Sequence, residues 1–109
     1  MSQKLDPSQI LSADVSLRAL ARSDLQGGVL EVTGELDGET VSAMVAMAER
    51  QISDATSDLG LGRPFAWHLS LGNAVWYVVH CQEELVVLLG SSSKNPTATL
   101  KKIAKTCGA

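Results

Sequence analysis

The feature that most constrains the fold is a pair of apolar strand candidates in the second half of the chain. Residues 74–81 read AVWYVVHC and are apolar on both faces of a strand, and residues 85–89 read LVVLL without a polar interruption. Such strands need cover on both faces of their sheet. The chain must therefore place other elements on both sides of a sheet.

A third strand candidate, residues 65–71, precedes the first two. It is joined to residues 74–81 by Gly72-Asn73, a glycine/asparagine pair typical of a two-residue hairpin turn. This turn predicts that Leu69 pairs with Trp76 and that Trp67 pairs with Val78. The two tryptophans are then diagonal neighbours on one face, where they either pack in the core or anchor an interface.

Two shorter strands are predicted earlier, at residues 15–22 and 29–33, with the turn Gly27-Gly28 between them. Paired glycines adopt the positive φ values of tight turns at little cost. These two strands therefore form a hairpin, which raises the number of strands to five.

A long helix is predicted over residues 37–59, with Asp37 as its N-cap and Gly60 ending it. Its apolar stripe predicts one buried face: Val41, Met44, Val45, Ala48, Ile52, Ala55 and Leu59. A second weakly apolar side carries Ala43, Ala46 and Met47, beside Arg50 and Asp54. Either the alanines there simply favour helix, or this second side meets another chain.

Helices are also predicted near both ends of the sequence. Asp6-Pro7 can start a first helix of one or two turns, and Asn95-Pro96 can start a last helix. The last helix has a regular inward stripe: Leu100, Ile103, Ala104 and Cys107. The predicted fold is a single domain over residues 1–109, of the α+β class, with a five-stranded antiparallel sheet sandwiched between helices.

Composition excludes several functions. The net charge of −3 argues against a general nucleic-acid binder, and no apolar run is long enough to insert in a membrane. The first residues lack the apolar core of a secretory signal, and the two cysteines cannot form a disulfide framework. A cytoplasmic domain with reduced thiols is therefore expected.

Reactive side chains are few. His68 and His80 are predicted on opposite faces of the sheet, and Cys81 points away from the adjacent His80, so neither a metal site nor a Cys–His pair is expected. We therefore predict that the chain is not an enzyme and needs no cofactor.

The order of elements and several segments resemble the Roadblock/dynein light chain family. Residues 15–37, VSLRALARSDLQGGVLEVTGELD, resemble its first hairpin, and residues 65–90, FAWHLSLGNAVWYVVHCQEELVVLLG, resemble its central strands. The segment 95–105 resembles its last helix. The sequence departs from the family in its first helix, which has at most two turns.

The resemblance implies a Roadblock/profilin-like α/β/α fold and a non-catalytic interaction module. Proteins of this family form homodimers, or heterodimers with similar modules, by aligning their long helices and the strand that follows. They regulate or scaffold small Ras-like GTPases, or act as motor light chains. By position, the resemblance places these residues at the dimer or partner interface: Ala43, Met47, Arg50, Asp54, Phe65, Trp67 and Leu69.

An alternative interpretation is a small-molecule sensor built on a profilin-like or PAS-like sheet. In that case Trp67, Trp76 and Tyr77 are expected to line a pocket. Bound ligand in the purified protein distinguishes this alternative from the interaction module.

Overall fold

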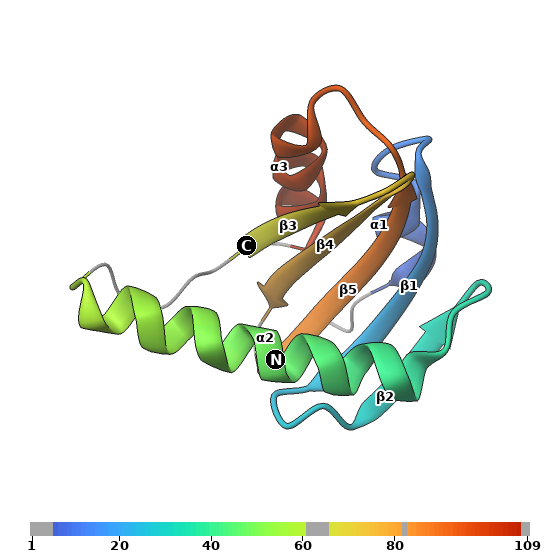
Figure 1. Ribbon diagram of the computed structural model, residues 1–109. Helices are drawn as coiled ribbons and strands as arrows, with labels where there is room; N and C mark the ends of the chain where they lie inside the picture. The colour runs from blue at the N-terminus through green and yellow to red at the C-terminus, as the bar shows by residue number, and fades with distance from the viewer. Residues whose placement is uncertain (1–5, 61–65, 82, 108–109) are drawn as a thin grey trace.

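The protein is built in three layers around an antiparallel sheet, in a computed structural model that describes residues 6–60, 66–81 and 83–107 (Figure 1). The elements follow in this order: α1 (Pro7–Leu11), β1 (Leu17–Asp24), β2 (Val29–Thr33), α2 (Gly38–Asp58), β3 (Ala66–Leu71), β4 (Ala74–Cys81), β5 (Glu84–Ser91) and α3 (Pro96–Thr106). The strand order in space is β2-β1-β5-β4-β3. Helix α2 covers one face of the sheet, and α1 and α3 cover the other. The predicted fold class is confirmed, including the short first helix.

The helix ends lie where the capping residues predict them. The Asp37 side chain accepts a hydrogen bond from the Thr40 amide at 3.3 Å, and the Asn95 side chain accepts one from the Ala98 amide at 3.2 Å. Gly60, with φ of +73°, follows the C-cap of α2. These bonds satisfy backbone groups that a helix leaves open at its ends.

The predicted β3–β4 register is also confirmed. Trp67 lies opposite Val78, and Leu69 lies opposite Trp76. Side chains alternate between the faces of a strand, so both tryptophans face α2.

The β1–β2 hairpin closes tightly against α2. The Asp24 carboxylate accepts hydrogen bonds from the amides of Gln26 and Gly28, at 2.9 and 2.8 Å. Gly27 has φ of +95°, and a Cβ atom there would lie 3.2 Å from α2. Further along, Arg22 pairs with Glu31 while Ser23 pairs with Val29, so Leu30 is an extra residue that forms a bulge in the edge strand β2.

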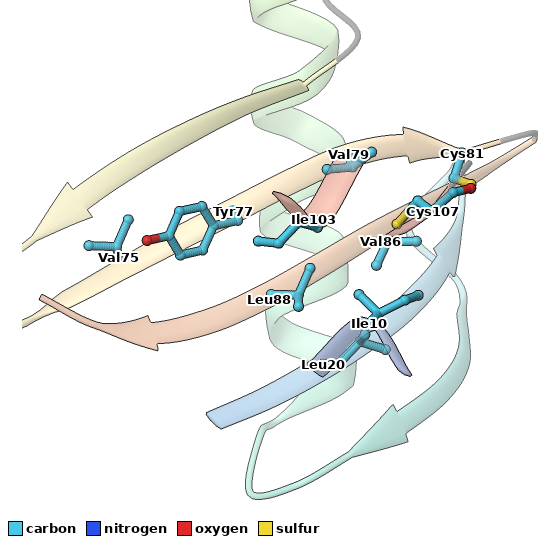
Figure 2. Close-up of a cluster of buried hydrophobic side chains, with 10 residues drawn as sticks. All are labelled: Ile10, Leu20, Val75, Tyr77, Val79, Cys81, Val86, Leu88, Ile103 and Cys107. Carbon is cyan, nitrogen blue, oxygen red and sulfur yellow. The ribbon is translucent and has the colours of Figure 1, made fainter. Parts of the chain in front are cut away.

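The larger core lies between the sheet and the α1/α3 layer. Figure 2 shows its side chains, which come from three strands and both short helices. They are Ile10, Leu20, Val75, Tyr77, Val79, Cys81, Val86, Leu88, Ile103 and Cys107. The burial of Cys107 on the inner stripe of α3 is as predicted.

The core under α2 is smaller and covers only part of the sheet. It contains Val45, Val78, Leu85 and Val87. The helix packs mainly on β2, β1 and β5, and its C-terminal part extends past the sheet (Figure 1). The α2 face of β3 and β4 is consequently left partly open.

The predicted buried face of α2 is partly wrong. Met44 and Leu59, expected to face the sheet, are exposed, whereas Ala46, expected on the outer side, is buried together with Ser42. The physical reason is the Gly27 turn, which lies against Ser42, Ala43 and Ala46. Only small side chains allow this close approach, so α2 turns Ser42 and Ala46 inward and turns Met44 outward.

Candidate interaction surface

An apolar groove runs between α2 and the edge of the sheet formed by β3 and β4. It encloses about 330 Å³, and α2 forms one wall while the strands form the other. Its lining comprises Val41, Met44, Val45, Ala48, Trp67, Leu69, Leu71 and Trp76. The groove exists because α2 passes over the other half of the sheet.

Large apolar side chains around this groove are exposed to water. Met44 is 66% exposed and Leu69 is 47% exposed, and Met47, one helical turn from Met44, is 64% exposed. Apolar residues that gather in this way mark interaction sites more often than scattered ones do. Within the described residues, the outer edge of β3 pairs with no strand, so its backbone groups are open to another chain.

Six of the seven residues expected at the interface lie in the described part of the chain, in three places. Trp67 and Leu69 line the groove, whereas Arg50 and Asp54 line a second, smaller pocket of about 170 Å³. Ala43 and Met47 are exposed on α2. The remaining expected residue, Phe65, lies outside the described residues.

A buried acidic side chain at the smaller pocket links α2 to both strands of the β3–β4 hairpin. Glu49 is only 6% exposed, and its Oε2 accepts a hydrogen bond of 2.6 Å from the indole Nε1 of Trp67. Its Oε1 lies 2.6 Å from Nε2 of His80, an ion-pair distance without the geometry of a hydrogen bond. A buried carboxylate needs such partners, because an unpaired one is strongly disfavoured.

Sequence reasoning missed Glu49, although one signal could have found it. Glu49 lies four residues after Val45 and three after Ala46, on the helix face that is buried. An acidic residue at that spacing indicates a polar partner on the facing sheet.

The two histidines lie on opposite faces of the sheet, as the hairpin register predicts. Nε2 of His68 is 3.5 Å from the Thr97 hydroxyl, on the side covered by α3. The structure corrects the expectation for Tyr77, which is fully buried in the larger core and does not line the groove. Within the described residues, no group of three or more His, Cys, Asp or Glu side chains could hold a metal ion.

A network of ion pairs around Arg22 lies away from the groove. The Arg22 guanidinium contacts Glu31 at 2.9 Å and Glu84 at 2.5 Å, and these bonds, Glu84 foremost, raise the pKa of Arg22. The network ties β2 and β5 to the central β1.

No helix in the described part of the chain is long and apolar enough to cross a bilayer.

Together, these features define a three-layer α/β/α domain with an open apolar groove at one edge of its sheet. No family model and no curated protein matches the sequence. Solved structures do match the fold. The Roadblock/LC7 domain from Streptomyces avermitilis has a TM-score of 0.81 at 11% identity, over 96% of this chain and 93% of that chain.

Two further similar structures are MglB proteins. MglB from Myxococcus xanthus has a TM-score of 0.71 at 12% identity, over 91% of each chain. An MglB with a tetrameric arrangement has a TM-score of 0.75 at 19% identity, over 93% of this chain and 81% of that chain. The chain therefore has the fold of the Roadblock/LC7 domains, in agreement with the resemblance of its sequence.

Proposed function

We propose that this chain is a non-catalytic interaction module of the cytoplasm, which forms a homodimer through α2 and β3 and regulates or scaffolds a small Ras-like GTPase. The observation that carries the proposal is the apolar groove between α2 and β3, which Met44 and Leu69 line as exposed side chains, with Met47 exposed one helical turn from Met44.

A second copy of the chain fits this surface for a physical reason. The exposed β3 edge offers backbone hydrogen bonds, and the exposed side of α2 offers apolar side chains to the open face of β3 and β4. Two copies related by a twofold axis would use the same surfaces reciprocally. The Roadblock resemblance implies pairing through these same two elements.

The test measures association as a function of concentration. Sedimentation velocity of the full chain should give a dimer at micromolar concentration. Leu69→Glu and Met47→Glu should weaken the dimer by more than roughly tenfold while the far-UV spectrum stays unchanged, because association would bury an unpaired charge.

Leu30→Glu is the matched control, since Leu30 is an exposed leucine on β2, at the opposite edge of the sheet. This variant should dimerise like the wild type. A wild-type chain that stays monomeric at 100-fold higher concentration would overturn the homodimer, as would a Leu30→Glu effect equal to that of Leu69→Glu.

The GTPase partner is supported by the family resemblance and by the Roadblock/LC7 fold. Its test is co-purification from the native host, followed by a GTP-hydrolysis assay of the recovered GTPase with and without this chain. A changed hydrolysis rate indicates regulation, and an unchanged rate in a stable complex indicates scaffolding. Absence of any GTPase from the recovered complex counts against the proposal.

The small-molecule sensor remains the second candidate, because the groove is apolar, has the volume of a small-ligand site and includes two tryptophans. Native mass spectrometry of the purified protein distinguishes the two functions. A co-purifying small molecule that is lost in Leu69→Glu favours the sensor.

A further inference from the structure

We infer that Glu49, His80 and Trp67 form a pH-responsive latch, in which protonation of His80 holds Trp67 in place as part of the groove wall. These three residues come from α2, β4 and β3, and they are joined by one hydrogen bond, Trp67 to Glu49, and one ion-pair contact, His80 to Glu49, each of 2.6 Å. The latch itself does not depend on what fills the groove.

The first step is the role of Trp67. Its ring lines the groove, while its indole nitrogen donates to the Glu49 carboxylate behind it. One hydrogen bond therefore couples the apolar wall to a buried charge. Any movement of the carboxylate removes the polar partner of the indole and loosens the wall.

The second step is the charge at Glu49. Each carboxylate oxygen has its own neighbour, Trp67 at Oε2 and His80 at Oε1. Histidine changes its charge between about pH 5 and 8. A protonated His80 compensates the buried negative charge, whereas a neutral His80 has no charge to offer and makes no hydrogen bond to Glu49 in this structure.

The third step is the alternative position for the carboxylate. Glu49 and His80 border the smaller pocket, which is open to solvent and is also lined by Arg50 and Asp54. When His80 is neutral, solvent in this pocket is available to the carboxylate in its place, and the Arg50 guanidinium borders the same space.

The other elements that border the smaller pocket or contact the pair present apolar or aromatic side chains there. The β1–β2 hairpin presents Leu25, β5 presents Leu85 opposite His80, and β3 presents Trp67. Arg50 and Asp54 are therefore the charged side chains that face the pair. Acidification from about pH 8 to pH 6 should close the latch.

The experiment follows the two indole N–H signals of the full-length protein by proton–nitrogen correlation NMR between pH 8.5 and pH 6. Trp76→Phe assigns the remaining signal to Trp67. We expect the Trp67 signal to move downfield and to exchange more slowly with solvent as the pH falls, because its bond to the carboxylate becomes more populated.

Two variants and one control make the result specific. His80→Gln and Glu49→Gln should each abolish the pH-dependent movement, since neither variant can form the charged pair. His68→Gln, the other histidine on the opposite face, should keep it. A Trp67 signal that does not move in the wild type, or that moves equally in His80→Gln, would overturn the latch.

A second readout rests on the proposed homodimer. If a second copy fills the groove, dimerisation should be roughly fivefold tighter at pH 6 than at pH 8, and His80→Gln should remove this difference. The two proposals can fail separately. If the protein is monomeric and its Trp67 signal moves with pH, the latch holds and the homodimer is refuted. If the protein is dimeric and its Trp67 signal does not move, the homodimer holds and the latch is refuted.

Discussion

The two cysteine side chains are kept protonated by burial. Burial raises the pKa of the Cys107 thiol to about 12, and it also raises the pKa of Cys81. The Cys81 thiol donates a hydrogen bond of 2.8 Å to the carbonyl oxygen of Cys107. Because the thiolate is the reactive form, both residues should be inert toward alkylation in the folded protein.

This expectation is checked by mass spectrometry after treatment with iodoacetamide at pH 8. The folded protein should remain unmodified over a time in which the urea-unfolded protein is modified at both cysteines. Rapid modification of the folded protein at either position would contradict the buried placement.

Gly27 is a glycine that the fold requires where the β1–β2 turn meets α2. It combines φ of +95° with three atoms of α2 at 3.2 Å from any Cβ, whereas Gly72 has φ of +60° and open space around it. Gly27→Ala should therefore destabilise the protein by more than about 1 kcal/mol, and by more than Gly72→Ala does. Urea unfolding measures the free energy of unfolding of both variants. Equal losses of this free energy would show that the close contact with α2 adds nothing to the effect of Gly27→Ala.

At the scale of the elements, the N-cap of α2 should make stability depend on pH. Hydrogen bonds from the Thr40 side chain and amide lower the pKa of Asp37 from 3.8. A lowered pKa in the folded state stabilises the fold above the unfolded value, and this contribution is lost as the pH falls below about 4. The thermal midpoint of unfolding should therefore decrease between pH 5 and pH 3.

Asp37→Asn isolates this contribution, because asparagine caps a helix without titrating. The decrease between pH 5 and pH 3 should be smaller in this variant. Asp14, whose pKa is lowered mainly by hydrogen bonds from Ser16, titrates in both proteins and so cancels from the comparison. Identical decreases would contradict the role of the Asp37 carboxylate.

The elements themselves could be predicted because their signals are local. Asp37, Asn95 and the Gly72 turn define helix starts and a hairpin register within a few residues, and the structure agrees at each. The register also brought Trp67 and Leu69 to one face, as predicted. Local chemistry was sufficient for these features.

The rotation of α2 and the role of Glu49 could not be predicted in the same way. Apolar periodicity favours Met44 as an inward residue, but the Gly27 turn selects the small Ser42 and Ala46 instead. That turn belongs to a hairpin which meets α2 only in the folded chain. The groove exists because of this tertiary contact. The sequence therefore indicated the strand residues that line the groove, but it did not indicate that Met44 would be an exposed part of its wall.

At the scale of the whole molecule, protection from hydrogen exchange should be uneven. Strand β5 is hydrogen-bonded on both sides, to β1 and β4, and lies between two cores. Its amides should exchange slowest in the monomer, whereas those of β3 and of the projecting part of α2 should exchange faster.

Raising the protein concentration provides the discriminating measurement. If the proposed homodimer forms, β3 and α2 should gain protection at high concentration while β2 does not. Exchange of β3 that is as slow as that of β5 at nanomolar concentration would contradict the open edge.

The bulge at Leu30 gives the two margins of the sheet different shapes. A bulge bends and twists a strand, which discourages the joining of further strands, whereas β3 pairs with β4 in unbroken register. A chain whose two edge strands could both pair with another copy would add copies without limit and grow into a fibre. Here only β3 offers a regular edge for pairing, so growth would stop once the β3 edges of two copies have paired.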